Sequence, residues 1–185
     1  YFSSFQKRAI NTLKLIQKTI GIENKNFEEA WQLNERHYGA LTGLNKEEMK
    51  KKLGDKKIYE FRRSWSLKPE NLDKNSAYHP LNIKKYKNVP KENIPDSESL
   101  EDTYNRVIPY FEYKILKLLK SNKNILVAAH GNSIRALCKY LLKVSNEDIS
   151  NLEIPTGNPL VINFDTSLKV IKAKYLDEAR AKKLL

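Results

Sequence analysis

Hydrophobic side chains recur every three or four residues in three segments of the chain, and this spacing is typical of amphipathic α-helices. The segments cover residues 3–20, 99–121 and 133–142. In the first, Ser3 and Gln6 have the spacing of a capping box. The apolar positions that define these helical faces are, in chain order, Phe5, Ala9, Leu13, Ile16, Ile20, Leu100, Tyr104, Val107, Ile108, Phe111, Ile115, Leu118, Ile134, Leu137, Cys138 and Leu141.

Turn and cap residues refine these helices and add two shorter ones. Ser99, with Asp102 three residues later, is expected to cap the second long helix, and Pro109 is expected to bend it. Shorter helices are expected at residues 45–55, between an Asn45 cap and a Gly54 stop, and at residues 56–65. Residues 145–152 also suit a short capped helix.

Three short apolar stretches indicate strands. The run NILVAA, residues 124–129, is rich in β-branched and aliphatic side chains, so a strand buried on both faces is expected there. Further strands are expected at residues 159–165 and 169–176. Helices that alternate with strands predict an α/β fold, a three-layer sandwich with a mostly parallel central sheet flanked by helices.

A long stretch without periodicity interrupts this alternation. Residues 64–98 contain Pro69, Pro80, Pro90 and Pro95 and no clear helical or strand pattern. Connections of this length often form lids or binding loops, although surface padding without a role is equally compatible with the pattern. We therefore expect one domain over residues 1–185 with a long insertion or lid around residues 64–98.

Composition narrows the class of protein only modestly. The formal net charge is +12, which attracts anionic partners, but the lysines are scattered and also fit a compositional bias with no function. No apolar run approaches the roughly 18 residues of a membrane helix, so a soluble protein without a membrane partner is expected. The low cysteine content fits a reducing compartment, and a cytoplasmic location is expected. Cys138 is the single cysteine, so no internal disulfide can form.

The clearest candidate chemistry lies in LVAAHGNSIR, residues 126–135, where the buried run stops and a helix starts. His130 follows the strand, at the edge of an α/β sheet where ligands bind. Gly131 permits close approach of a ligand, and Asn132 or Ser133 is expected to cap the helix, so that its free N–H groups face an anion. A phosphate or carboxylate fits this position. The alternative is a structural histidine bonded to a backbone carbonyl.

Other site types have little support. The three histidines do not have metal-ligand spacing and no cysteine pairs with them, so no metal site is expected. A serine hydrolase elbow, Gly-x-Ser-x-Gly, does not occur. Arginine and lysine side chains could complete an anion pocket, although each alone also suits an ordinary surface charge: Arg8, Lys46, Arg62 and Arg63. Glu35 is the one carboxylate in an apolar, aromatic stretch, a setting that suits proton transfer.

Five runs of the chain resemble a known family in order and spacing. They are LNERHYGALTGLNK, FRRS, ESLEDTYNRVIPYF, AAHGNSIRALCKYL and IPTGNPLV. The family is the cofactor-dependent phosphoglycerate mutases of the histidine phosphatase superfamily, and the resemblance covers nearly the whole chain. It implies a glycolytic isomerase that interconverts 3-phosphoglycerate and 2-phosphoglycerate. It further implies a phosphohistidine intermediate primed by 2,3-bisphosphoglycerate, no metal, and a homodimer or homotetramer.

The resemblance also assigns roles to individual residues. Glu35 matches the proton donor and acceptor, His130 the histidine that stabilises the phosphoryl group in transfer, and Arg8 the arginine that binds that group. Positions that match binding of the substrate carboxylate and phosphate are Arg36, Tyr38, Lys46, Arg62 and Arg63. Gly131 and Asn132 match contacts beside the phosphohistidine. The physical setting agrees, because phosphoryl transfer depends chiefly on positioning and positive charge.

The sequence departs from the family pattern in one respect. The family nucleophile is a histidine in an Arg-His-Gly run near the N-terminus, and the printed residues contain no such run, because Tyr38 follows Arg36 and His37. By comparison with the family and with ordinary domain size, we expect roughly fifty further residues before Tyr1. On that expectation, the printed residues alone are inactive.

Three alternatives remain open at this level. A bisphosphoglycerate mutase or phosphatase of the same superfamily would share most of these residues. An inactive scaffold would keep the fold without the chemistry. A basic nucleic-acid-binding module would need cations and aromatic side chains on one face, of which the chain has only fragments, so no nucleic-acid partner is expected.

Overall fold

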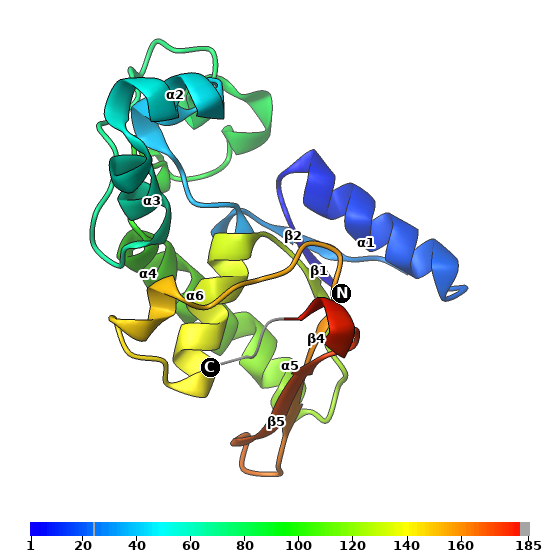
Figure 1. The fold of residues 1–185 in the computed structure, drawn as a ribbon. Coiled ribbons are helices and arrows are strands. Elements are labelled where there is room, and N and C mark those ends of the chain that lie inside the picture. The colour runs from blue at the N-terminus through cyan, green and yellow to red at the C-terminus, as the bar shows by residue number, and fades with distance from the viewer. Residues whose placement is uncertain (24, 182–185) are drawn as a thin grey trace.

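The computed structural model describes residues 1–23 and 25–181, except for the side chains of Lys46, Lys52 and Arg62. A parallel sheet of three short strands has the order β2-β1-β3. Figure 1 shows α1 on one side of this sheet and α4 and α6 on the other, so the expected α/β fold with a parallel sheet flanked by helices is confirmed. The bounds are β1 Phe2–Ser4, α1 Lys7–Thr19, β2 Glu28–Ala30, α4 Leu100–Tyr110, β3 Val127–Ala128 and α6 Gly131–Leu142.

The start of the chain differs from the expectation of a helix capped at Ser3. Residues 2–4 form the middle strand, in which Ser3 pairs with Glu29 of β2 and with Ala128 of β3. The helix α1 begins at Lys7, and the side chain of its N-cap Gln6 makes no capping hydrogen bond. The capping-box prediction is wrong because strand pairing on both sides fixes these residues, and local capping preference is weak against it.

The helical faces follow the sequence pattern except at Leu118 in the last turn of the second long helix, which is exposed, and at one position near the end of α1. Ile20 is exposed, whereas Gln17 is buried in its place on the inner face of α1. Gln17 is tolerated there because its amide donates to the carbonyl of Lys25 at 2.9 Å. Burial of a polar group costs little free energy when the group is hydrogen-bonded. Because the acceptor belongs to the loop after α1, this loop allows Gln17 to face inward.

The second long helix is capped as expected and changes its winding after the proline. Asp102 N donates to Ser99 Oγ at 3.0 Å and Ser99 N donates to Asp102 Oδ2 at 2.9 Å, so the predicted cap is confirmed. The irregularity expected at Pro109 takes the form of a π-helical turn, η6, at Phe111–Ile115, followed by α5 at Leu116–Lys120. A proline that removes one helical hydrogen bond favours such a wider turn.

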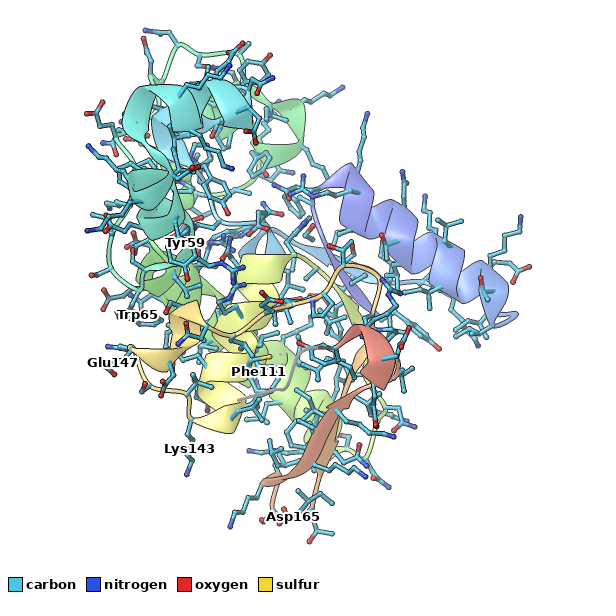
Figure 2. All side chains as sticks on the ribbon, in the orientation of Figure 1. Tyr59, Trp65, Phe111, Lys143, Glu147 and Asp165 are labelled. Atoms are coloured by element: carbon cyan, nitrogen blue, oxygen red, sulfur yellow. The ribbon has the colours of Figure 1, made fainter. Side chains whose placement is uncertain are left out.

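Two hydrophobic clusters form the core. The larger one joins Phe2 of β1 with Val107, Phe111 and Ala136, and Figure 2 shows Phe111 in the interior beside α6. The smaller one contains Cys138, whose burial raises the pKa of its thiol to about 12. The thiol is therefore a buried, unreactive core group, on the apolar helical face where the sequence placed Cys138.

The last two predicted strands form a separate hairpin. The strands β4, Leu160–Phe164, and β5, Val170–Tyr175, pair antiparallel, and within the described residues they do not join the parallel sheet. Asp165 lies at the tip of this hairpin (Figure 2). Its side chain accepts from the backbone N–H groups of Ser167 and Lys169 at 2.9 Å each, which closes the turn.

The central part of the chain forms two short helices, which Figure 1 shows on the side of the molecule away from α1. The expected helices are present as α2, Lys46–Leu53, capped by Asn45, and α3, Asp55–Arg63. Residues 64–98 contain only short 3-10 turns. The turns of the chain are η1 Trp31–Leu33, η2 Gly39–Leu41, η3 Pro80–Asn82, η4 Lys84–Tyr86, η5 Lys91–Asn93, η7 Asp148–Ser150 and η8 Glu178–Arg180.

Residues 64–98 are tied to the segment that carries Glu35. Gly39 has φ +54°, and a Cβ there would lie 2.0 Å from the carbonyl oxygen of Glu70, so only glycine allows this approach. The buried His79 bonds Asp96 through Nε2 at 2.9 Å. The close approach of Gly39 and Glu70 holds the long irregular stretch against the segment that carries Glu35, whereas the bond between His79 and Asp96 lies within the stretch itself. In the described part of the chain, no helix is long and apolar enough to cross a membrane.

Candidate active site

His130 lies at the carboxyl end of β3 and occupies the N-cap position of α6. The expected cap, Asn132 or Ser133, is wrong by two or three residues, because Gly131 is already helical. Ser133 serves the cap from inside the first turn, since its Oγ accepts from the His130 backbone N–H at 3.1 Å. This arrangement turns the imidazole toward the sheet edge and α1.

The two ring nitrogens of His130 have different partners. Arg8 Nε can only donate, and it lies 3.1 Å from His130 Nδ1. Nδ1 is therefore the accepting nitrogen, and Nε2 carries the proton and donates to Ser4 Oγ at 2.7 Å. The imidazole is thus neutral and fixed in one tautomer between β1 and α1.

The electrostatics of this position agree with a neutral ring. Burial, together with the positive charges of Arg8 and Arg106, lowers the pKa of His130 to about 3. An anion placed beside Arg8 would oppose both of these charges. Binding of an anion beside Arg8 would therefore raise the pKa of His130.

Glu35 comes close to the first turn of α6 although it lies far away in the sequence. Its Oε1 accepts from the backbone N–H of Arg36 at 2.8 Å and from that of Asn132 at 3.3 Å. Its own N–H faces Gln6 Oε1 at 3.4 Å. Two backbone N–H groups, one of them from the first turn of α6, thus bind the half-buried carboxylate, an arrangement the sequence spacing cannot reveal.

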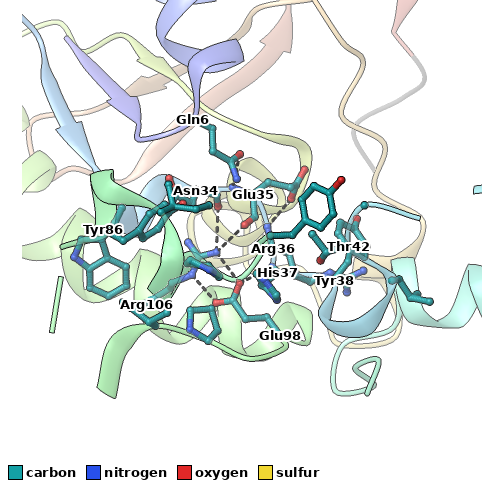
Figure 3. Close-up of a pocket in the computed structure, with 18 of the residues that line it drawn as sticks. Gln6, Asn34, Glu35, Arg36, His37, Tyr38, Thr42, Tyr86, Glu98 and Arg106 are labelled. Atoms are coloured by element: carbon teal, nitrogen blue, oxygen red, sulfur yellow. Dashed lines mark hydrogen bonds and ion pairs between the residues drawn. The ribbon is translucent and has the colours of Figure 1, made fainter. Parts of the chain in front are cut away.

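A cavity of about 440 Å³ opens beside Glu35. Four of the residues predicted from the sequence line it: Arg8, Glu35, Arg36 and Tyr38. Figure 3 shows Glu35, Arg36 and Tyr38 along one wall, with Gln6 above and Tyr86 at the far side. His130 and Asn132 do not line this cavity themselves, but they contact Arg8 and Glu35, which do.

Arg36 is almost fully buried and only partly satisfied. One of its terminal nitrogens donates to the carbonyl of Phe61, whereas its Nε and Nη1 have no partner among the described residues. Its guanidinium carbon lies 4.8 Å from the centre of the Tyr38 ring. Buried donors without a partner are costly, so the arrangement is suited to an anionic ligand that supplies the missing acceptors.

Arg135 links three parts of the site and was missed at the level of the sequence. Its Nε donates to the carbonyl of Leu152 at 2.9 Å, and Arg63 Nη1 reaches the same oxygen at 3.3 Å. Arg135 Nη1 donates to Asn132 Oδ1 at 2.7 Å. This bond directs Asn132 Nδ2 to the hydroxyl of Tyr38 at 2.9 Å. The only signal in the sequence is its position one helical turn after Asn132.

Burial lowers the pKa of Arg135 to about 10, and the nearby charge of Arg63 contributes in the same direction. This guanidinium is still charged at neutral pH. Together with Arg36 and Arg63 it gives the region behind Tyr38 a concentrated positive charge, which favours a multiply negative ligand.

Arg106 and Glu98 fix the backbone that carries Glu35. Arg106 Nε lies 2.6 Å from Glu98 Oε1, and Arg106 also donates to the carbonyls of Gln32 at 2.6 Å and Asn34 at 3.1 Å. Glu98 Oε2 accepts from the N–H of His37 at 2.7 Å. No local pattern distinguishes these two residues in the sequence, because the main-chain groups they bind lie more than sixty positions away.

The structure gives fewer contacts for the remaining predicted residues. Gly131 starts α6, and a Cβ there would meet nothing within 4 Å, so the space beside it is open. Lys46 lies in α2 and Arg62 in α3, but their side chains are outside the described part of the structure. Within the described residues, no group of three or more His, Cys, Asp or Glu side chains could hold a metal ion.

Comparison with known proteins gives a consistent result. A model of the histidine phosphatase superfamily (branch 1) matches residues 1–75 and 68–176. The chain is 61% identical over 185 residues to a 2,3-bisphosphoglycerate-dependent phosphoglycerate mutase of Pelagibacter ubique, covering 100% of this chain and 77% of that protein. It is 51% identical over 175 residues to the protein of the same name from Buchnera aphidicola, covering 95% and 76%.

Solved structures agree at the level of the fold. A mycobacterial glucosyl-3-phosphoglycerate phosphatase superposes with a TM-score of 0.63 at 16% identity, covering 94% of this chain and 74% of that one. An alpha-ribazole phosphatase from Shigella flexneri superposes with a TM-score of 0.57 at 16% identity, covering 92% and 70%.

Proposed function

The chain belongs to the histidine phosphatase superfamily, and on this basis we propose that it interconverts 3-phosphoglycerate and 2-phosphoglycerate as a 2,3-bisphosphoglycerate-dependent mutase. The support from sequence is the high identity to relatives of that name over the whole chain. The alternatives of an inactive scaffold and a basic nucleic-acid-binding module have no comparable support.

One structural observation carries the proposal. Arg8, Glu35 and His130 come from three distant segments, yet Arg8 contacts His130 and Glu35 bonds the helix that His130 caps. A carboxylate for proton transfer thus lies close to a histidine and an arginine that can stabilise phosphoryl charge. Phosphoryl transfer needs this combination, because positioning and electrostatic stabilisation provide most of the rate enhancement.

The proposed roles follow from the position of each group. Arg8 binds the phosphoryl group in transfer, and His130 stabilises the negative charge on its oxygens. Glu35 takes the proton from the attacking substrate hydroxyl and returns it to the leaving oxygen in the reverse step. The phosphoryl group alternates between substrate and a histidine nucleophile, and we assign that nucleophile to none of the printed histidines.

Arg36 and Tyr38 are proposed to bind the rest of the substrate from the wall of the cavity. The unpaired donors of Arg36 suit the carboxylate or the second phosphate, and Lys46, Arg62 and Arg63 are proposed as further cations for the same groups. Asn132 presents its backbone N–H and its amide beside Glu35 and Tyr38. Gly131 leaves open space at the first residue of α6.

We propose 2,3-bisphosphoglycerate as the primer that supplies the first phosphoryl group. The positive charge of Arg36, Arg63 and Arg135 around the site fits a ligand with two phosphates and a carboxylate. No metal is proposed, since cationic side chains supply the charge. We further propose that the protein is cytoplasmic and has no nucleic-acid or membrane partner. We propose that it assembles as a homodimer or homotetramer.

The experiment that tests this function separates a mutase from a phosphatase. The natural full-length protein is incubated with 3-phosphoglycerate and a trace of 2,3-bisphosphoglycerate, and phosphorus NMR follows 2-phosphoglycerate and inorganic phosphate. We expect 2-phosphoglycerate to form much faster than free phosphate. Release of phosphate from the bisphosphate without formation of 2-phosphoglycerate would contradict the proposal and favour a bisphosphoglycerate phosphatase.

A further inference from the structure

Tyr86 brings a side chain of the 64–98 segment into the cavity beside Glu35. It ends the turn η4 and lines the cavity together with Gln6 and Arg8. Its ring packs edge-on against Phe5, with ring centroids 5.7 Å apart. Figure 3 shows Tyr86 on the side of the cavity opposite Tyr38, next to Asn34.

The direction of one hydrogen bond determines what the Tyr86 hydroxyl can do. The backbone N–H of Phe5 donates to Asn34 Oδ1 at 2.9 Å, so the amide oxygen of Asn34 must face Phe5. The other end of the amide, Nδ2, therefore donates to the Tyr86 hydroxyl oxygen at 2.8 Å. Tyr86 acts as the acceptor in this bond, and its own proton remains available as a donor.

No acceptor for this proton is found within the described part of the chain. The only hydrogen bond of the Tyr86 hydroxyl there is the one from Asn34. A partly buried hydroxyl with an unused proton next to a cavity is suited to a ligand oxygen.

The surrounding charges favour an anionic oxygen. Burial raises the pKa of Tyr86, while the positive charges of Arg106 and Arg8 lower it and that of Glu98 raises it. The hydroxyl is therefore protonated at neutral pH. Arg106 is neutralised by its ion pair with Glu98, whereas Arg8 faces the cavity with no carboxylate partner among the described residues.

We propose that the Tyr86 hydroxyl donates a hydrogen bond to a phosphate oxygen of the phosphoglycerate held by Arg8. The segment at residues 64–98 then contributes directly to substrate binding and does not serve only as a cover. This inference rests on the proposed function for the identity of the substrate, but the geometry of the donor is independent of it.

The test is Tyr86→Phe in the natural full-length protein, with Tyr113→Phe as the matched control. Tyr113 is 69% exposed and belongs to the π-helical turn of the long helix, outside the cavity lining. Loss of one hydrogen bond to a charged group predicts a KM for 3-phosphoglycerate about ten-fold higher, with kcat changed less than about two-fold. The dissociation constant of inorganic phosphate, measured by calorimetry, is expected to rise by a similar factor, and Tyr113→Phe is expected to change neither value.

Two outcomes would overturn the inference. An unchanged KM and phosphate affinity would show that the hydroxyl proton does not reach the ligand. A lower kcat with unchanged phosphate affinity would show that the tyrosine only supports Asn34, next to Glu35. Thermal unfolding of both variants checks that each is folded. Because phosphate binding does not require turnover, its result decides the role of Tyr86 even if the wild-type protein proves not to be a mutase.

Discussion

Arg106 and Glu98 form a buried ion pair, with 2.6 Å between Nε and Oε1, that holds the backbone of the segment carrying Glu35. The two side chains are 10% and 4% exposed. The terminal nitrogens of Arg106 also donate hydrogen bonds to the main-chain carbonyls at positions 32, 34 and 35. The pair therefore connects α4 to a stretch of chain that has almost no regular structure of its own.

Glu98→Gln is expected to lower the free energy of unfolding by about 3 kcal/mol, because it leaves the Arg106 guanidinium buried without its counter-charge. Urea unfolding followed by circular dichroism measures the change. Glu178→Gln is the control, since the pair that Glu178 forms with Lys174 is exposed and contributes less than about 0.5 kcal/mol. Equal small effects for both variants would show that the buried pair does not stabilise the fold.

Glu35→Gln is expected to reduce kcat by about 10²- to 10⁴-fold, because the amide cannot accept the substrate proton. The bonds from Arg36 and Asn132 can be retained by the amide oxygen, so KM and the melting temperature are expected to change little. Glu112→Gln, at an exposed bond to the Tyr140 hydroxyl, is the matched control. Near-normal turnover of Glu35→Gln would exclude Glu35 as the acid-base group.

Arg135→Lys is expected to reduce kcat/KM about ten-fold, because a lysine cannot hold both the Leu152 carbonyl and Asn132 Oδ1. The Asn132 amide then loses its fixed orientation toward Tyr38. Arg180→Lys is the control, since Arg180 is an exposed arginine that bonds the carbonyl of Thr156. If both variants keep wild-type kinetics, the orientation of Asn132 by Arg135 is not required.

His130 is expected to make stability depend on pH below neutrality. Burial and the charge of Arg8 lower its pKa in the folded protein to about 3, from an ordinary value of 6.5. As the pH falls below about 6.5 the unfolded chain takes up a proton that the folded protein does not bind until near pH 3. The free energy of unfolding therefore falls over this range, and above about pH 6.5 His130 adds no slope.

The comparison of wild-type protein with His130→Asn isolates this contribution. Urea unfolding at intervals between pH 4 and pH 8 should give a shallower dependence for the variant. Some slope remains in it, because burial also lowers the pKa of His37. Parallel curves for the two proteins would mean that His130 is not held neutral in the fold.

Much of the fold could be predicted from the sequence because the relevant signals are local. The Ser99 cap, the Asn45 cap and the helical spacing of α4 and α6 depend on residues within a few positions of one another. The two C-terminal strands were also predicted, although their separation from the parallel sheet was not. The N-terminal strand was mistaken for a helix start, because its partners Glu29 and Ala128 lie far along the chain.

The features of the candidate site also fall into those set by the sequence and those set by the tertiary structure. The sequence by itself determined the chemical groups, since the runs around Glu35 and His130 carry a carboxylate, a histidine and several cations in a recognisable order. Only the tertiary structure decided which groups meet, which tautomer His130 adopts, and that Arg106, Arg135 and Tyr86 belong to the site. The physical reason is that a residue's chemistry is a property of its side chain, whereas its protonation and hydrogen-bond direction depend on neighbours that only folding brings within reach.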